Sequence, residues 1–260
     1  MLRQRTLSAL VLAVPVLFCV AAGRPYFDVM VAVGAAIMVW EWFRLCSSAF
    51  PLLEAIAAGI SILAALGLTG FDEAGYGLLV LAAGSVLVAA LSRGRWWFSA
   101  APFYIGLPSV SLVWLRGDPA LGLETVLWLL AVVWMSDIGA YAVGRSIGGP
   151  KLAVRLSPKK TWAGLLGAMA SAGAAGAATA AVMALASVWP LALVSAGLGA
   201  AAQAGDLFES FAKRRFGVKD TSSLIPGHGG LLDRVDALIV VAALTALISV
   251  LGGGSMLAWI

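Results

Sequence analysis

The residues best suited to chemistry gather in one polar stretch, from Gly205 to Asp236, which lies between two apolar runs. The stretch holds five of the thirteen acidic residues, five of the seventeen basic residues and the only histidine of the chain. Carboxylates mixed with cations suit a hard metal ion that carries a polyphosphate. Charged residues at a membrane boundary also form ordinary salt-bridged loops, so the mixture of charges alone leaves both interpretations open.

Two helices are expected to present the acidic side chains of this stretch. The first continues out of an apolar run, ends at Gly217 and carries four polar residues on one face: Asp206, Glu209, Ser210 and Lys213. The second begins near Leu231 and returns to the membrane, with Asp233 and Asp236 on one face at i and i+3. The acidic residues of the two helices are therefore predicted to converge.

A glycine-rich loop joins the two helices. Residues 223–230 read SLIPGHGG, with one proline and three glycines, so the backbone can turn sharply and offer N–H groups to an anion. The cations expected around it are Lys213, Arg214, Lys219 and Arg234. His228 either orders this loop or contacts the substrate directly, and the sequence leaves both roles open.

A second charged stretch precedes the first along the chain. Asp137 lies inside or just below an apolar helix, where an acid is costly and usually has a partner or a task, and Tyr141 follows it at i+4. The alternative is that Asp137 caps a helix or pairs with a nearby arginine. Further on, Ser157, Lys159 and Lys160 combine a hydroxyl with two ammonium groups, which suits phosphate oxygens, although two lysines also mark an ordinary cytoplasmic flank.

Composition predicts an all-α, polytopic membrane bundle. The chain of 260 residues is 62% hydrophobic and 12% charged, whereas soluble domains have roughly 25% charged residues. We expect one membrane domain over 1–260, with N-terminal spans in 1–120 and catalytic spans and cytoplasmic loops in 121–260. The almost purely Gly, Ala and Ser sequence of the seventh apolar run predicts a helix that packs closely against its neighbours.

About nine apolar runs are long enough to be candidate spans. They are Thr6–Ala22, Phe27–Leu45, Leu52–Leu68, Tyr76–Leu91, Phe98–Leu115, Leu121–Val143, Gly164–Leu185, Pro190–Ala204 and Ala237–Leu251. With a cytoplasmic N-terminus, fifteen Lys and Arg residues fall inside and two, Arg24 and Arg116, outside, as the positive-inside rule requires. Both charged stretches then face the cytoplasm, where nucleoside triphosphates occur. The first run has a cleavable signal peptide as its alternative.

The charged residues also resemble the signature of the phosphatidate cytidylyltransferases, also called CDP-diacylglycerol synthases. The matching positions are Ser210, Lys213, Arg214, Lys219, Asp220, His228, Gly229, Gly230, Asp233, Arg234 and Asp236. Upstream, Asp137, Tyr141, Gly144 and Arg145, followed by the sequence SPKKT, look like the second conserved block of this family. The chain departs from the pattern directly after Lys219-Asp220: a serine and then a glycine are expected there, and the chain has Thr221-Ser222-Ser223. It also has Ala163 where a glutamate is expected.

The resemblance implies that CTP and phosphatidate react to give CDP-diacylglycerol and diphosphate, with Mg²⁺ as cofactor, with or without a second cation. Asp206, Asp233 and Asp236 are the expected metal ligands, with Asp220 as a further one, and Lys219 joins these acids as a catalytic residue. The expected substrate-binding residues are Ser157, Lys159, Lys160, Ser210, Lys213, Arg214, His228, Arg234, Asp137 and Tyr141. The membrane lipid is a partner, a homodimer is implied by the resemblance only, and no nucleic acid is expected.

The expected location is the inner membrane of a bacterium, with the active site on the cytoplasmic side. Two alternatives stay open. A CTP-dependent enzyme acting on another lipid, such as a CDP-archaeol synthase or a polyprenol kinase, would carry similar residues. A transporter would also use intramembrane acids such as Asp137 and Asp206, but it would not need a dense cationic loop on one side.

Overall fold

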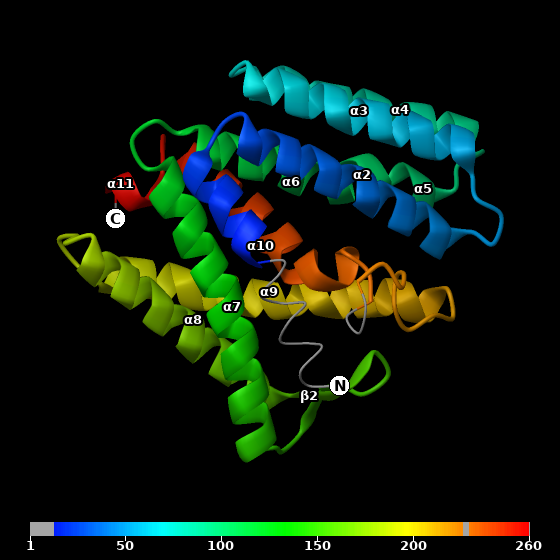
Figure 1. Ribbon diagram of the computed structural model, residues 1–260. Coiled ribbons are helices and arrows are strands. Elements are labelled where there is room, and N and C mark those ends of the chain that lie inside the picture. The colour runs from blue at the N-terminus through cyan, green and yellow to red at the C-terminus, as the bar shows by residue number, and fades with distance from the viewer. Residues whose placement is uncertain (1–12, 226–228, 260) are drawn as a thin grey trace. The chain divides into compact units, whose positions relative to one another are not determined.

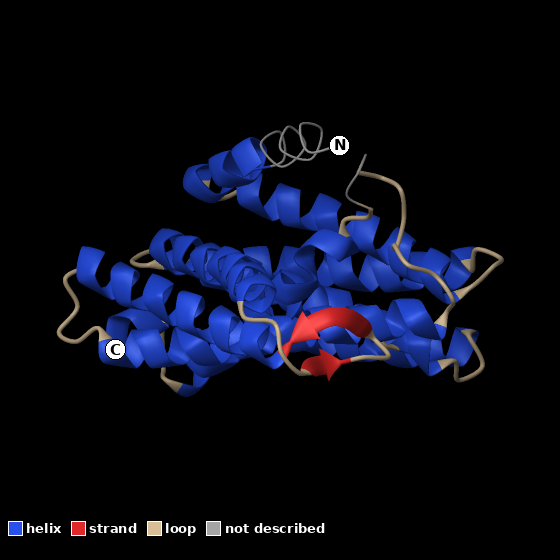
Figure 2. Cartoon of the chain, turned by 90° about the horizontal axis from the view of Figure 1, so that it is seen from below, coloured by secondary structure: helices blue, strands red, loops and turns tan. Residues whose placement is uncertain are grey.

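The structure is a computed structural model that describes residues 13–225 and 229–259, and most of these residues are helical (Figures 1 and 2). After a helix over Ala13–Ala22, the helices are α2 (Tyr26–Cys46), α3 (Leu52–Gly70), α4 (Ala74–Leu91), α5 (Trp96–Ser99), α6 (Ala101–Gly117), α7 (Gly122–Ser146), α8 (Trp162–Val182), α9 (Trp189–Arg215), α10 (Leu232–Leu251) and α11 (Met256–Trp259). The strands β1 (Lys151–Ala153) and β2 (Ser157–Thr161) form an antiparallel hairpin between α7 and α8.

Eight helices of the described chain are long and apolar enough to cross a membrane, which confirms the expected polytopic helical fold. Seven of these eight agree with a predicted run to within about five residues at each end, and α9 continues past Ala204 to Arg215, as the polar helix predicted to follow that run. The expected first span, Thr6–Ala22, falls partly on residues 1–12, outside the described ranges, and its described part is the helix Ala13–Ala22. The expected fifth span consists of α5 and α6, and the first turn of α6 contains Pro102, a position where proline removes no helical hydrogen bond.

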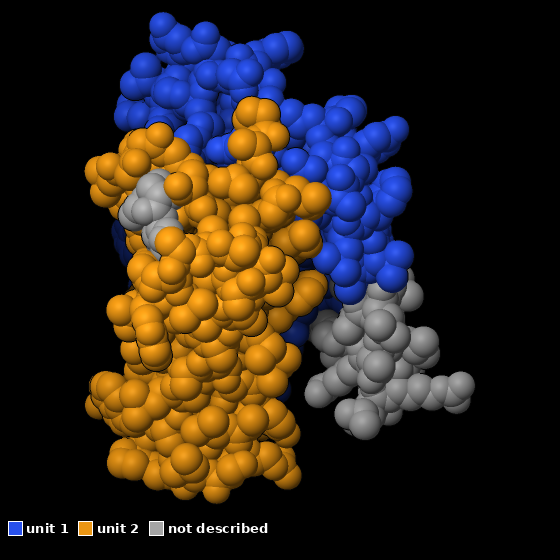
Figure 3. Space-filling view, turned by 90° about the vertical axis from the view of Figure 1, so that its left-hand side faces the viewer, with its two compact units in different colours: residues 1–118, 215–235 blue, residues 119–214, 236–260 orange. Residues whose placement is uncertain are grey.

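The chain divides into two compact units, which Figure 3 colours separately. Unit 1 comprises residues 1–118 and 215–235, and unit 2 comprises residues 119–214 and 236–260. Helix α10 begins in unit 1 and continues in unit 2.

In unit 1, the helices α2, α3, α4 and α6 pack against one another through close glycine contacts. A Cβ on Gly77 would lie 2.9 Å from the carbonyl oxygen of Ala65, so α4 can approach α3 only because this residue is a glycine. The short helix α5 packs under the end of α2, where the indole N–H of Trp42 donates to the carbonyl of Trp97 at 2.7 Å and Phe43 contacts Phe98 edge-to-face. This end of α2 carries the acidic residue Glu41, which is fully buried.

In unit 2, α8 packs closely against both α7 and α9, which confirms the expectation of a packing helix. A Cβ on Gly167 of α8 would lie 2.6 Å from the carbonyl oxygen of Gly139 on α7. On the other side, a Cβ on Gly199 of α9 would lie 2.7 Å from the Cβ of Ala172. Small residues therefore let the three backbones come together where no other side chain would fit.

The β-hairpin, visible as the pair of red strands in Figure 2, was not expected from the sequence. Helix α7 is followed by Gly148 and Gly149, which both adopt positive φ values, 67° and 90°, and so turn the chain out of the helix. The strands then pair Lys151 with Thr161, and the Thr161 hydroxyl accepts a hydrogen bond from the Gly164 N–H at 3.0 Å. This bond caps α8 and joins the end of β2 to the start of that helix.

Candidate active site

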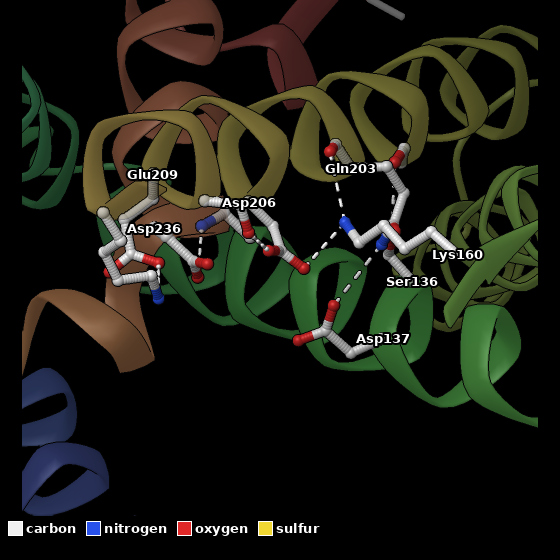
Figure 4. Close-up of polar contacts among 11 residues, drawn as sticks. Ser136, Asp137, Lys160, Gln203, Asp206, Glu209 and Asp236 are labelled. Atoms are coloured by element: carbon white, nitrogen blue, oxygen red, sulfur yellow. Dashed lines mark hydrogen bonds and ion pairs between the residues drawn. The ribbon is translucent and has the colours of Figure 1, made fainter. Parts of the chain in front are cut away.

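An acidic cluster in unit 2 consists of Asp206 and Glu209 from α9 and Asp236 from α10 (Figure 4). One carboxylate oxygen of each residue lies within 4.8 Å of the others. The two α9 residues share a face because they are three positions apart. Helix α10 can approach this face because residue 205 is a glycine: a Cβ there would lie only 2.7 Å from the carbonyl oxygen of Asp236. Three oxygen donors at this spacing fit a hard divalent cation such as Mg²⁺.

Two lysines neutralise part of this cluster. Lys160 of β2 places its Nζ 2.7 Å from Oδ2 of Asp206 and also donates to the Gln203 carbonyl at 3.3 Å (Figure 4). Lys213, one turn after Glu209, places its Nζ 2.7 Å from Oε2 of that residue. Glu209 is nearly fully buried, at 2% exposure, so its charge depends on such a partner. Both ammonium groups lie where phosphate oxygens bound at the cluster would meet them.

Asp137 of α7 is connected to the same face of α9. The side-chain amide of Gln203 donates to Oδ1 of Asp137 and to the hydroxyl of Ser136, both at 3.5 Å. Gln203 precedes Asp206 by three residues, so the two side chains are neighbours on α9. These hydrogen bonds of Gln203 (Figure 4) therefore connect the two charged stretches of the sequence within unit 2. Neither stretch predicted a role for this residue.

In unit 1, the loop after α9 is organised around two buried carboxylates. Oδ2 of Asp233 accepts hydrogen bonds from the Thr221 N–H, the Thr221 hydroxyl and the Gly230 N–H, at 2.8 to 2.9 Å. Glu41 of α2 accepts from the Ser222 hydroxyl at 2.6 Å and from the N–H groups of residues 231 and 232, both at 2.8 Å. The sequence predicts that backbone N–H groups of this loop bind an anion. At residues 230–232 these N–H groups instead bind carboxylates of the protein, Asp233 and Glu41.

The comparisons with known proteins agree over almost the whole chain. A family model described as "Cytidylyltransferase family" matches residues 3–251. The chain belongs to the cytidylyltransferase family. A protein of Brucella suis named phosphatidate cytidylyltransferase is 40% identical over 254 residues, which cover 94% of this chain and 91% of the relative. Proteins of the same name from Pseudomonas aeruginosa and Bacillus subtilis are 38% and 29% identical, each over 92% of this chain and at least 93% of the relative.

Several of the residues predicted from the cytidylyltransferase signature have a defined place in the structure. Ser210 donates to Oδ1 of Asp206 at 3.4 Å, next to the acidic cluster. Lys159 is exposed while Lys160 points to Asp206, because successive residues of a strand face opposite sides. Tyr141 is exposed and accepts a hydrogen bond from Arg145 at 3.1 Å. Ser157 is half-buried in β2.

The remaining predicted residues lie at the end of α9, on the loop or at the start of α10. Arg214, Lys219, Asp220 and Arg234 are exposed, and their roles stay predictions. His228 lies outside the described residues. Asp233 lies in the first turn of α10, in unit 1, where groups of the preceding loop donate to its Oδ2, and its role as a metal ligand also stays a prediction.

Sequence reasoning did not select three residues that the structure brings into these sites. Glu209 joins the acidic cluster, and its signal was visible because it shares a helix face with Asp206 at i+3. Glu41 had a weaker signal, an acid inside an apolar run, which is costly without a partner. Gln203 had none, because a single amide at the end of an apolar run is common.

Proposed function

We propose that this protein is a phosphatidate cytidylyltransferase that forms CDP-diacylglycerol and diphosphate from CTP and phosphatidate. The match to relatives of that name over nearly the whole chain supports this assignment. The observation that carries it in the structure is the acidic cluster of Asp206, Glu209 and Asp236, with Lys160 and Lys213 each 2.7 Å from one of its carboxylates. Such a site favours a polyphosphate bound through a cation.

The chemistry requires little from the protein beyond positioning and charge neutralisation. The phosphate of phosphatidate has a second pKa of about 6, so it is already a nucleophilic dianion near neutral pH. One of its oxygens attacks the α-phosphorus of CTP, the bond from that phosphorus to the β-phosphate oxygen breaks, and diphosphate leaves. The obstacle is the repulsion between two anions, and preorganised cations in a water-poor site reduce it.

The acidic cluster fits Mg²⁺ because all three donors are carboxylate oxygens. When bound there, the cation would neutralise triphosphate oxygens and stabilise the leaving diphosphate. Lys160 and Lys213 would add positive charge beside the same oxygens. Ser210 would orient Asp206 by its hydrogen bond, and Asp137 would hold Gln203 on the same face of α9. Lys159, Arg214, Lys219 and Arg234 are proposed to contact phosphate groups on the basis of the family signature.

The protein is helical and has eight helices of membrane-spanning length in its described chain, which suits a lipid substrate. We place it in the inner membrane of a bacterium, since the relatives are bacterial, with the site on the cytoplasmic side, since fifteen of the seventeen Lys and Arg residues then face the cytoplasm. A homodimer is part of the proposal through the family resemblance alone. Size-exclusion chromatography with light scattering of the detergent-solubilised protein tests it.

The experiment that tests the function uses purified protein and CTP labelled at either the α- or the γ-phosphate. With phosphatidate, label from the α-position is expected to enter the lipid and label from the γ-position to appear in diphosphate. Transfer of γ-label to a polyprenol would make the protein a kinase, and α-label entering only an archaeol phosphate would make it a CDP-archaeol synthase. Solute uptake into proteoliposomes without CTP turnover would favour a transporter.

A further inference from the structure

Glu41 is a carboxylate in an unusual place. It lies near the end of the apolar helix α2, between helix residues that are themselves buried, and its side chain is fully buried at 0% exposure. Burying a charged carboxylate costs several kcal/mol unless its oxygens are hydrogen-bonded. Glu41 meets that condition with three donors, and all three belong to a segment about 180 to 190 residues further along the chain.

Two of these donors are the N–H groups that begin helix α10. Leu231 and Leu232 donate to Oε1 and Oε2 of Glu41, both at 2.8 Å. The first N–H groups of a helix have no partner within that helix, and the N-terminus carries a partial positive charge, so a carboxylate stabilises it. Most helices obtain this cap from a Ser, Thr, Asp or Asn just before the first turn. Here the residue before the helix is Leu231, which has no side-chain oxygen, and α2 supplies the cap instead.

The third donor ties the other end of the glycine-rich loop to the same carboxylate. The hydroxyl of Ser222 donates to Oε1 of Glu41 at 2.6 Å, and next to it the Thr221 N–H and hydroxyl donate to Asp233. Glu41 and Asp233 thus close the loop between residues 221–222 and residues 230–232. Gly230 lies between the two acids, and a Cβ on it would clash with Oε1 of Glu41 and with the Thr221 hydroxyl.

The described residues of the enclosed segment, 223–225 and 229, make few further hydrogen bonds, and one of them joins the Leu224 N–H to the Ser222 hydroxyl at 3.1 Å. Ser223 and Leu224 are exposed, and the Ile225 N–H donates to the Gly229 carbonyl at 2.8 Å. The same segment is flanked by the residues that the family signature assigns to phosphate or metal binding, Lys219 and Asp220 before it and Arg234 after it. The orientation of these side chains therefore depends on the carboxylate that closes the loop.

We propose that Glu41 is a positioning residue of the cytidylyltransferase reaction: from helix α2, its carboxylate holds residues 219–225 and 229–232 and the first turn of α10 in the conformation that binds the phosphates. This inference rests on the proposed function. It gives a role in the reaction to a residue of the N-terminal spans.

The test compares Glu41→Gln, Glu41→Asp and wild-type protein by kcat and KM for CTP and for phosphatidate, per folded molecule. The glutamine keeps the size but turns an NH₂ group toward backbone donors. Because misplacing reacting groups by about 1 Å can cost 10²-fold in rate, we expect Glu41→Gln to lose about 10²-fold in kcat/KM for CTP. Glu41→Asp keeps the charge and is expected to recover about tenfold of that loss, because the shorter side chain retains part of the bonding.

A matched control separates positioning from stability. Leu81 of α4 is also fully buried in unit 1, where its side chain lies against Gly106 of α6. Leu81→Ala is expected to lower the melting temperature at least as much as Glu41→Gln while KM for CTP stays within about twofold of wild type, since it only removes core packing. If Glu41→Gln behaves like Leu81→Ala per folded molecule, the proposal is wrong.

A second variant covers the case in which Glu41→Gln does not fold. Ser222→Ala removes one of the three donors and leaves the buried carboxylate with its two backbone bonds, and we expect a three- to tenfold loss of kcat/KM, about the net size of one ordinary hydrogen bond. Unchanged kinetics of a folded Ser222→Ala would overturn the proposal. Failure of wild-type protein to turn over CTP with phosphatidate would instead overturn the proposed function, so the two failures are distinguishable.

Discussion

The two groups of acids in this protein have different surroundings. In unit 2, the carboxylates of Asp206, Glu209 and Asp236 lie close together. Lys160 contacts the first of them and Lys213 the second. In unit 1, Glu41 and Asp233 accept hydrogen bonds mainly from backbone N–H groups and hydroxyls of a single loop. Ammonium groups on flexible side chains can move aside for a metal ion and its phosphates, whereas backbone donors cannot leave without unfolding the loop. The acidic cluster of unit 2 is therefore suited to bind a metal ion, whereas Glu41 and Asp233 of unit 1 are suited to hold a loop in one conformation.

The largest expected effect comes from removing a carboxylate of the acidic cluster. Asp236→Asn should lower kcat by about 10³-fold, because the charge that opposes the cation is lost where the transition state needs it most. Chelation of divalent ions should abolish wild-type turnover, and added Mg²⁺ should restore it. Glu73→Gln, which changes an exposed acid at the start of α4, is the control and should leave the rate unchanged. Near-normal turnover of Asp236→Asn would remove the cluster from the mechanism.

Asp233→Asn should abolish most activity for a different reason. The amide would present an N–H to donors on Thr221 and Gly230, so the loop would lose its geometry and kcat/KM should fall by about 10²-fold with expression unchanged. The Mg²⁺ concentration that gives half-maximal activity is the decisive measurement. If it is unchanged, Asp233 acts through the loop; if it rises tenfold or more, Asp233 is also a metal ligand, as the family signature predicts, and the contrast between the two groups of acids weakens.

The two neighbouring lysines of β2 allow a finer comparison. Lys160→Gln should raise KM for CTP by about tenfold, equivalent to one charge-assisted contact of about 1.4 kcal/mol, because Lys160 lies 2.7 Å from Asp206. Lys159→Gln should raise KM for CTP less, by about two- to threefold, because solvent screens the contact of the exposed Lys159 with phosphate oxygens. Steady-state kinetics with both variants at one ionic strength measure the difference. An equal rise of KM in both variants would show that the opposite orientation of successive strand side chains does not decide which lysine binds CTP.

The smallest effects are expected at Thr221, where the family pattern has a serine. Thr221→Ser keeps the hydroxyl that donates to Asp233 and should leave activity within about twofold of wild type. Thr221→Val removes that hydroxyl from a buried position and should cost about 1 kcal/mol of stability, with a lower melting temperature in detergent. A serine variant as impaired as the valine variant would mean that the methyl group, and not the hydroxyl, matters.

The structure explains the departures from the family signature at residues 221 and 222, but not the alanine at residue 163. Thr221 keeps the donor of the expected serine, and Ser222, where a glycine is expected, uses its hydroxyl to reach Glu41. From the sequence alone these changes put the turn in doubt. In the structure, each hydroxyl of the pair donates to a buried acid, so the substitutions are consistent with the loop.

The helical fold and much of the acidic cluster were determined by the sequence. Runs of apolar residues place the helices to within a few residues, because a backbone in lipid must satisfy its hydrogen bonds within each helix. The spacing of Asp206, Glu209 and Ser210 places them on one face, because the period of the α-helix is known in advance. Local chemistry also predicted that α9 would end before Gly217, whose φ of 73° suits a residue without a Cβ.

Only the tertiary structure decided which partner each charged group has. The pairs of Glu41 with Leu232, Lys160 with Asp206 and Gln203 with Asp137 join residues between 46 and 191 positions apart, and no periodicity spans such distances. They depend on how closely the helices approach, which glycines such as Gly205 and Gly230 permit through the absence of a Cβ. The sequence therefore predicts where acids occur on their helices, while packing determines whether an acid faces a cation or a backbone donor.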